Sequence, residues 1–191
     1  MKYPLKISLC GMGGQGIILS AVILGTTAVT QNGLYATQTQ SYGSEARGGQ
    51  CQAELIIDDK SINSPVAEKK DVLIALFQEA YEKYIDTLEE DGILVYDPDL
   101  VTNLTRTVDK TYALPATQLA TDLGSRMSAN MVVLGFVARA FAFYTKEQLI
   151  KVVREETNAR FLDVNLKAIE VGYDYACTHL DVPQEAVNGS V

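Results

Sequence analysis

A glycine-rich stretch near the start of the chain has the composition and spacing of a phosphate-binding turn. It reads GMGGQG from Gly11 to Gly16 and follows the short apolar run Ile7–Cys10. Glycines between a strand and a helix let the backbone approach a phosphate, and the first N–H groups of the helix add partial positive charge. The stretch predicts a backbone cradle for an anionic ligand, made of Gly11, Gly13, Gly14, Gln15 and Gly16. Tight packing of a strand against a helix also needs small residues, so a structural role stays open.

The spacing Gly-x-Gly-x-x-Gly is typical of dinucleotide sites, but the rest of that pattern is missing. An NAD site needs an Asp or Glu about 20 residues further on, at the end of the next strand, to bind the ribose hydroxyls. The corresponding window, Tyr35–Gln40, contains no acidic residue. Gln15 also places a long amide where a small residue is common. The sequence therefore argues against an independent NAD- or FAD-dependent enzyme.

A second candidate loop follows at Ser41–Gly49, with the sequence SYGSEARGG. Its only cation, Arg47, is followed by Gly48 and Gly49, which allow close approach of a ligand or of another backbone. The planar guanidinium of arginine suits two-pronged contacts with phosphate or carboxylate. We predict Arg47, Gly48 and Gly49 as further members of the binding site. The alternative is a surface loop in which Glu45 pairs with Arg47.

Residues that usually perform catalysis or bind metals are sparse. The one histidine, His179, is expected at the exposed end of the last helix, and Cys10, Cys51 and Cys177 are expected as buried small hydrophobic residues. This set cannot supply Ser–His–Asp or Cys–His catalysis, a His-based zinc site or a cluster held by four thiolates. No Gly-x-x-x-x-Gly-Lys-Ser/Thr phosphate loop occurs. We predict no catalytic residue and no metal ligand in this chain.

Composition and charge exclude several classes of partner. The 191 residues are 47% hydrophobic and 21% charged, as in ordinary globular proteins. The net charge of −8 argues against a nucleic-acid partner, because phosphate backbones are bound by basic faces. No apolar run approaches the roughly 20 residues of a membrane span. Without a signal peptide, and with an odd number of scattered cysteines, the expected location is the cytoplasm.

Strand and helix patterns alternate along the first part of the chain, and the last third is helical from Ala116 onward. Strands are expected at Ile7–Cys10, Leu34–Gln40, Gln52–Asp58, Asp71–Phe77, Gly92–Asp97 and Tyr112–Pro115. Helices are expected at Ile17–Gln31, Glu79–Glu90, Met127–Tyr144, Leu149–Glu156 and Arg160–Thr178. This order predicts a three-layer α/β/α fold with a mostly parallel sheet and a helical C-terminal third.

The pattern predicts one domain over residues 1–180, followed by a flexible polar tail at 181–191. In a doubly wound sheet, both candidate loops would emerge at the carboxyl edge of the strands, where ligands bind in such folds.

Several motifs together carry a family resemblance. They are GMGGQG at Gly11–Gly16, SYGSEARGG at Ser41–Gly49, DVLIALFQEAY at Asp71–Tyr81, GILVYDPDLV at Gly92–Val101, Asn130-Met131 with Leu134-Gly135, and Asn165-Leu166 with Ala168. Over about residues 5–175 the chain resembles the gamma subunit of 2-oxoacid:ferredoxin oxidoreductases. The form of the second loop is most similar to the 2-oxoglutarate branch.

The resemblance implies a role inside a multi-subunit enzyme. Enzymes of this family oxidatively decarboxylate a 2-oxoacid, couple the acyl group to coenzyme A and pass two electrons to ferredoxin or another acceptor. Thiamine diphosphate and iron–sulfur clusters reside mainly on the partner subunits, which are alpha, beta and in some cases a ferredoxin-like delta subunit. This chain would be an accessory subunit that is inactive alone. The alternatives are a self-contained nucleotide-binding oxidoreductase and a pure interaction module.

Overall fold

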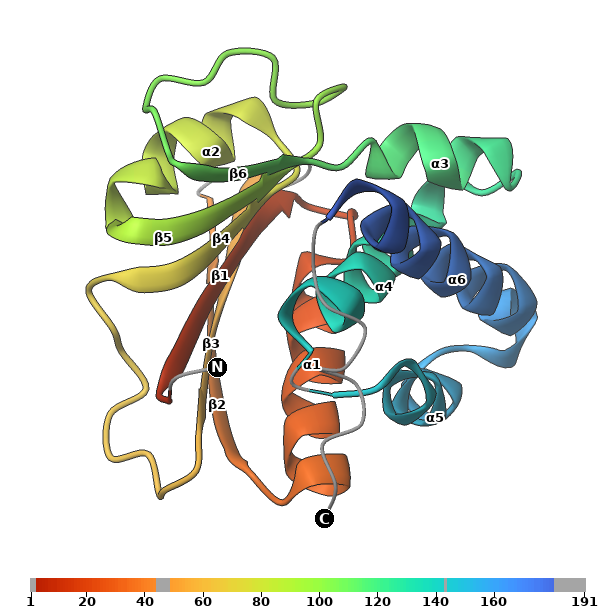
Figure 1. The fold of residues 1–191 in the computed structure, drawn as a ribbon, viewed down its shortest axis with the longest axis horizontal. Helices are drawn as coiled ribbons and strands as arrows, with labels where there is room; N and C mark the ends of the chain where they lie inside the picture. Colours follow the sequence, from red (N-terminus) through yellow and green to blue (C-terminus); the bar gives the residue numbers. More distant parts are fainter. Residues whose placement is uncertain (1–2, 44–48, 143, 181–191) are drawn as a thin grey trace.

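A computed structural model describes residues 3–43, 49–142 and 144–180 of the chain. A single six-stranded sheet forms its centre, in the order β2-β3-β1-β4-β5-β6 (Figure 1). Its strands are β1 (Leu5–Met12), β2 (Tyr35–Tyr42), β3 (Gln50–Asp58), β4 (Lys70–Ala75), β5 (Leu88–Tyr96) and β6 (Lys110–Ala113). Strands β1, β4, β5 and β6 are parallel neighbours, whereas β3 runs antiparallel to both β1 and β2. The predicted mostly parallel sheet is confirmed.

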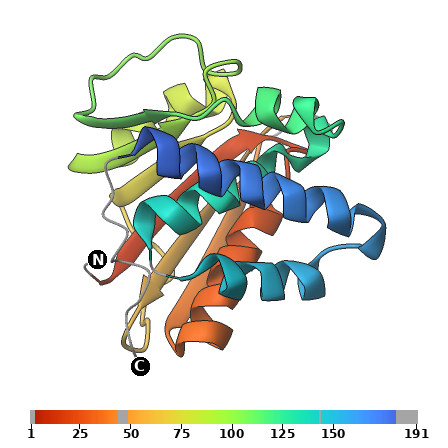
Figure 2. The same ribbon diagram turned by 45° about the vertical axis from the view of Figure 1, so that its right-hand side comes forward.

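Helices cover both faces of this sheet (Figures 1 and 2). The α-helices are α1 (Ile17–Asn32), α2 (Gln78–Tyr84), α3 (Ala116–Asp122), α4 (Ala129–Phe141), α5 (Lys146–Glu156) and α6 (Leu162–His179). The short 3₁₀ helices are η1 (Ile85–Thr87), η2 (Arg126–Ser128) and η3 (Ala159–Phe161). Helix α2 lies on one face, and α1 and α4 lie on the other with α5 and α6 outside them. This arrangement confirms the α/β/α layers and the helical C-terminal third.

The consecutive apolar residues of β4 explain why both faces must be covered. Val72 and Ile74 belong to the core shared with α1 and α4, whereas Leu73 and Ala75 belong to the core under α2. All four side chains are at most 1% exposed. Because successive strand residues point to opposite faces, an uninterrupted apolar run requires a layer on each side.

Helices α4 and α6 cross at two glycines. A Cβ atom added to Gly135 would meet the carbonyl oxygen of Ile169, and one added to Gly172 would meet that of Val132. The two backbones are therefore in direct contact, which only glycine permits on either helix. This crossing fixes α4, whose N-terminal end faces the glycine-rich turn.

One predicted helix was wrong in extent. The expected helix Glu79–Glu90 ends at Tyr84, passes through η1 and gives way to β5 at Leu88. The guanidinium of Arg106 donates to the carbonyl oxygens of Ile85, Leu88 and Glu89 at 3.0, 2.8 and 3.2 Å. The bond to Ile85 occupies a carbonyl that a longer helix would have used, and all three bonds hold the chain where it passes from η1 into β5. The contact joins segments 17–21 residues apart and has no local sequence signal.

The expected helix Met127–Tyr144 is also shorter than predicted. Residues Arg126–Ser128 form η2, and α4 ends at Phe141, followed by Ala142 in the left-handed conformation at φ +49°. Other helix boundaries agree with their signals. Gly33 ends α1 with φ +64°, and Thr145 begins α5 with a capping box completed by Gln148.

The sheet is not doubly wound as we expected. Strands β2 and β3 form an antiparallel hairpin, and β3 is inserted between β2 and β1. The predicted tail, residues 181–191, lies outside the described residues.

Candidate ligand-binding cleft at the glycine turn

The predicted glycine cradle forms the turn from β1 into α1. Gly14 and Gly16 have φ angles of +96° and +74°, in the left-handed region that favours glycine. Gly11 is buried, and a Cβ there would lie 2.5 Å from Oε1 of Gln15. Gly13 and Gly14 are exposed at the outside of the turn. The turn therefore needs glycine for conformation or space at three positions and presents bare backbone at its tip.

Gln15 holds this turn in place. Its Oε1 accepts a hydrogen bond from the backbone N–H of Met12 at 2.6 Å, and its Nε2 donates to the carbonyl oxygen of Leu76 at 2.8 Å. Leu76 directly follows β4, so the amide ties the turn to the neighbouring strand end. Both ends of the amide are engaged within the protein, which makes Gln15 a residue that positions the cradle.

The second predicted loop reaches the glycine turn. The backbone N–H of Gly13 donates to the carbonyl oxygen of Gly49 at 2.9 Å. The expected convergence of the two loops is therefore found at this residue pair. Its cause is the β2–β3 hairpin, whose connection emerges beside the end of β1. Arg47 and Gly48 lie outside the described residues.

The N-terminus of α1 opens toward the same region. The helix has no acidic residue in its first turn and no side-chain hydrogen bond at its N-cap, Gly16. Its first N–H groups therefore have no partner within the helix, and the helix dipole favours an anion there by roughly 0.3–1 kcal/mol. Asn130, only 4% exposed, faces Gly16: a Cβ on Gly16 would lie 2.4 Å from its Nδ2.

Two hollows lie on either side of the turn and share Gly14 and Met127. The first, about 380 Å³, is lined by Met12, Gly13, Gly14, Gln15, Leu76, Leu100, Thr117, Arg126, Met127 and Ala129. The second, about 330 Å³, is lined mainly by the start of α1, the start of α4 and the segment that precedes α6. Met127 is 75% exposed, so a large flexible apolar side chain stands between them. Together they can accept a ligand with an anionic centre and apolar parts.

Asp97 holds residues that line the first hollow in place through hydrogen bonds. It is fully buried at the end of β5, and its Oδ2 accepts from the backbone N–H of Thr117 at 2.8 Å. Its Oδ1 accepts from the N–H of Asp99 at 3.0 Å. Its carbonyl oxygen accepts from the N–H of Leu100 at 3.1 Å, so Asp97 holds both Leu100 and Thr117, which line the hollow.

Sequence reasoning missed three residues of this cleft: Arg126, Met127 and Asn130. They belong to η2 and the start of α4, more than a hundred positions from the glycine turn. Asn130 appeared only within the family motif Asn130-Met131. Nothing in the local pattern of Arg126 or Met127 distinguishes them from ordinary exposed residues, because only the packing of α4 brings them here.

The cysteine prediction was correct for two residues and wrong for one. Cys10 and Cys51 are buried, and burial raises the pKa of both thiols, so both remain protonated at neutral pH. Cys177 is exposed near the end of α6, and its Sγ receives a hydrogen bond from Nε of the buried Arg139 of α4 at 3.3 Å. His179 is exposed at the end of α6, as predicted, with its ring stacked on Tyr175 at 3.9 Å.

Within residues 3–43, 49–142 and 144–180, no three His, Cys, Asp or Glu side chains gather as a possible metal site. None of the helices in these same ranges is long and apolar enough to cross a membrane.

Comparison with known proteins assigns the fold and motifs to a family. The family of pyruvate ferredoxin/flavodoxin oxidoreductases matches residues 6–175. The chain belongs to this family. A similar curated relative is the 2-oxoglutarate synthase subunit KorC of Methanocaldococcus jannaschii, at 40% identity over 92% of this chain and 96% of the relative.

Two solved structures of the oxidoreductase family share the architecture. The keto/oxoacid ferredoxin oxidoreductase gamma subunit of Geobacter sulfurreducens is 38% identical with a TM-score of 0.80, and the match covers 91% of this chain and 99% of that one. The 2-oxoglutarate:ferredoxin oxidoreductase of Magnetococcus marinus, solved with 2-oxoglutarate, coenzyme A and succinyl-CoA, is 25% identical with a TM-score of 0.82. That match covers 96% of this chain but 33% of the larger one.

Proposed function

We propose that this chain is the gamma-type accessory subunit of an enzyme that oxidatively decarboxylates a 2-oxoacid, with 2-oxoglutarate as the first candidate. The enzyme forms the acyl-CoA and reduces ferredoxin or another acceptor. The observation that carries the proposal is the 40% identity with a 2-oxoglutarate synthase subunit along 96% of that subunit. The gamma subunit of known structure, which matches over nearly its whole length, supports the same role.

The proposal places most of the chemistry on other chains. Thiamine diphosphate would supply the carbanion chemistry and iron–sulfur clusters the electron transfer, both held by alpha, beta and, where present, delta subunits. The function of this chain is then to complete the active site from one side.

Coenzyme A is the substrate that the cleft fits best. The molecule combines phosphates with an apolar chain, and the cleft combines bare backbone N–H groups with the side chains of Met12, Leu100 and Met127. We propose that the glycine turn holds a phosphate of coenzyme A and that Arg126, at the rim of the first hollow, pairs with it. Gln15 and Asn130 would keep the turn in place.

The proposed binding set keeps all eight residues predicted from the sequence: Gly11, Gly13, Gly14, Gln15, Gly16, Arg47, Gly48 and Gly49. The support for Arg47 and Gly48 is their position in the sequence alone. They precede Gly49, whose carbonyl oxygen accepts a hydrogen bond from Gly13. Backbone groups and one or two guanidinium groups suffice for phosphate, so the acidic net charge of −8 is no obstacle.

Reconstitution tests this function directly. The chain should be purified alone and assayed for 2-oxoacid-dependent, coenzyme A-dependent dye reduction, then assayed again after addition of alpha and beta subunits from the same organism. We expect no turnover from the isolated chain and turnover only from the complete mixture. Parallel assays with 2-oxoglutarate, pyruvate and a branched-chain 2-oxoacid then identify which 2-oxoacid is the substrate.

Turnover by the isolated chain would instead support a self-contained enzyme. The fold argues against its NAD form, because in that site the strand after the first helix lies beside the first strand and its end binds the ribose. Here β3 separates β2 from β1. If the chain assembles but its removal leaves turnover unchanged, the interaction module is the correct alternative.

The same proposal includes a cytoplasmic location, as expected for an enzyme that uses coenzyme A and reduces ferredoxin or another acceptor. It also treats residues 1–180 as one domain.

A further inference from the structure

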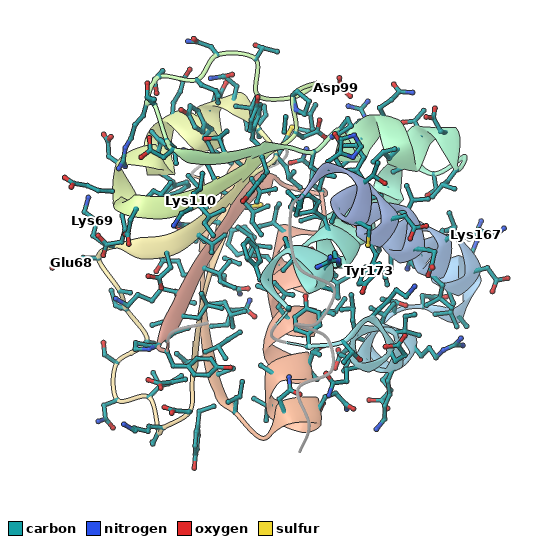
Figure 3. All side chains as sticks on the ribbon, in the orientation of Figure 1. Glu68, Lys69, Asp99, Lys110, Lys167 and Tyr173 are labelled. Carbon is teal, nitrogen blue, oxygen red and sulfur yellow. The ribbon has the colours of Figure 1, made fainter. Side chains whose placement is uncertain are left out.

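The two outer strands of the sheet differ in how well they are protected from pairing. At one edge, β6 is four residues long and carries Lys110 (Figure 3). At the other edge, β2 is eight residues long and reads YATQTQSY, with no charge, proline or glycine. Natural edge strands are usually short, charged or interrupted by proline, because an open edge pairs with other chains. Strand β2 has none of these protections.

An apolar groove runs alongside this open edge. It lies between α1 and β2, has a volume of about 310 Å³ and is lined by Val22, Gly25, Thr26, Val29, Thr30, Ala36, Thr37, Gln38 and Leu55. Val29 is 44% exposed although it sits on an apolar helix. Ala36 is small and leaves the groove open toward the edge. A strand added beside β2 would place alternate side chains in this groove.

Both ends of β2 expose tyrosines: Tyr35 is 51% exposed and Tyr42 is 63% exposed. Neither belongs to the glycine turn or to the residues lining the two hollows beside it. An uncharged strand, an apolar groove and exposed aromatic side chains together have the properties of a strand-pairing interface.

We propose that β2 pairs antiparallel with β2 of a second copy of this chain, which joins the two sheets into one continuous sheet of twelve strands. The two-fold axis would stand perpendicular to the sheet at Thr39. This proposal rests on the edge and the groove alone and does not depend on the function proposed above.

The side-chain pairs favour this register. An axis perpendicular to the sheet keeps each side chain on its own face of the sheet. Two residues that pair across the axis therefore point to the same face. With the axis at Thr39, Thr39 faces its own copy, Gln38 faces Gln40 and Thr37 faces Ser41. Every one of these pairs can form hydrogen bonds between side chains, and none brings like charges together.

The same register fills the groove. Tyr42 of the second copy lies opposite Ala36, on the face that α1 covers. Its exposed ring would enter the space beside Val22 and Val29, where Ala36 leaves room. The contact occurs twice, once on each side of the axis. Strand pairing and tyrosine insertion thus bury the open edge and the exposed aromatic residues in one step.

Charge substitution at the axis tests the pairing. Thr39→Lys and Thr39→Glu each place like charges directly opposite each other, and we expect each to weaken self-association of the full chain about tenfold or more. Mixed in equal amounts, the two variants should associate again, because lysine then faces glutamate. Leu104→Lys is the control: it adds the same charge to a 39% exposed residue in the loop that precedes the other edge strand. Sedimentation velocity from about 1 to 200 µM measures association, and thermal unfolding by circular dichroism verifies that each variant folds.

A wild-type chain that stays monomeric throughout this range would overturn the proposal, as would variants that associate normally or that fail to recover on mixing. A second measurement uses the assembled enzyme: Thr39→Cys in a Cys177→Ser background should form a disulfide-linked dimer of this subunit under mild oxidation, and Leu104→Cys should not. If Thr39→Lys releases a different subunit from the enzyme instead, β2 pairs with that subunit and the second-copy assignment is wrong.

Discussion

The backbone N–H of Gly13 donates a 2.9 Å hydrogen bond to the carbonyl oxygen of Gly49, which joins two loops that lie 36 positions apart. One loop connects β1 to α1, and the other connects β2 to β3. The carbonyl of Gly49 cannot bind an anion, so the two loops meet through their backbones and leave the tip of the glycine turn free. Within the turn, the N–H of Gln15 is likewise occupied, by the carbonyl oxygen of Met12 at 3.1 Å.

Substitution of Gly16 should mainly lower stability, whereas substitution of Gly14 should mainly weaken ligand binding. Gly16→Ala combines positive φ with a Cβ 2.4 Å from Asn130, so we expect a loss of about 2–4 kcal/mol in the free energy of unfolding. Gly14→Ala has positive φ but no atom within 4 Å of its Cβ, so it should lose only about 1 kcal/mol. Its methyl group points into open space at the cleft and should raise KM for coenzyme A.

Urea unfolding of both variants and kinetics of the reconstituted enzyme distinguish these effects. Adding Asn130→Ala to Gly16→Ala should restore part of the stability, because it removes the clash but not the backbone strain. Equal destabilisation by the two glycine substitutions would contradict the contact between Gly16 and Asn130.

The stability of the protein should depend on both the donor and the acceptor of the Gln15 side-chain amide. Gln15→Leu removes both hydrogen bonds and leaves the N–H of Met12 and the carbonyl of Leu76 without their partner, at a cost of about 1–3 kcal/mol. Gln15→Glu keeps an acceptor for Met12 but turns a carboxylate toward the Leu76 carbonyl. We expect this variant to be less stable than wild type at pH 7 and to recover part of the difference near pH 4, where the protonated acid can donate.

Thermal melting of wild type, Gln15→Leu and Gln15→Glu at both pH values provides the measurement. Gln118→Leu is a suitable control, since the Gln118 amide donates to Asp122 on an exposed helix surface. A Gln15→Leu variant as stable as Gln118→Leu would show that the amide bridge does not position the turn.

The sequence predicted those features whose causes are local. Helix α1 was placed within one residue because its apolar spacing is regular and Gly33 ends it. Strands β4 and β5 were recognised because apolar residues follow one another without alternation. The glycine turn was also recognised from local sequence, because the left-handed backbone at Gly14 and Gly16 favours glycine.

The features that sequence reasoning missed depend on contacts between distant segments. The end of α2 is fixed by Arg106, and the cleft wall by Arg126, Met127 and Asn130, none of which has a local pattern. The hairpin placement of β3 is decided by which strands pair, and a strand's sequence does not specify its neighbour. Cys177 was expected inside because cysteine is usually buried, but its position near the end of α6 leaves it exposed.

Cys10 should make the protein less stable at alkaline pH. Burial raises the pKa of its thiol from the ordinary value of 9.0, with the nearby Cys51 as a smaller cause. Below pH 9 the thiol keeps its proton in both the folded and the unfolded chain. Above it, the unfolded chain loses the proton and the folded chain does not, so stability falls by up to about 1.4 kcal/mol per pH unit for this group.

Cys10→Val removes the titrating group while keeping a buried apolar side chain. Between pH 8 and pH 10 it should lose less stability than wild type in urea unfolding. Cys177→Ser serves as the comparison, because Cys177 is exposed, and it should follow the wild-type curve. A Cys10→Val curve parallel to wild type over this range would contradict the prediction.

The last prediction concerns Arg126, the cation at the rim of the first hollow. If its guanidinium pairs with a phosphate of coenzyme A, the charge-assisted contact contributes about 1.5–3 kcal/mol to binding. Arg126→Ala should then raise KM for coenzyme A roughly tenfold or more in the reconstituted enzyme and leave KM for the 2-oxoacid unchanged. Arg126→Lys should restore only part of the affinity, because a point charge lacks the two-pronged geometry.

Arg154→Ala is the matched control, since Arg154 is an exposed arginine on α5 that lines neither hollow. The effect of Arg126→Ala on KM should shrink as salt rises from 0.05 to about 0.5 M, because an exposed pair is screened. Desulfo-coenzyme A, which lacks the reactive thiol, should inhibit wild type more strongly than Arg126→Ala. The ratio of the two inhibition constants should equal the ratio of the two KM values for coenzyme A. Unchanged KM for coenzyme A together with normal assembly would exclude Arg126 from the phosphate site, and a change in 2-oxoacid KM alone would place the 2-oxoacid at this rim instead.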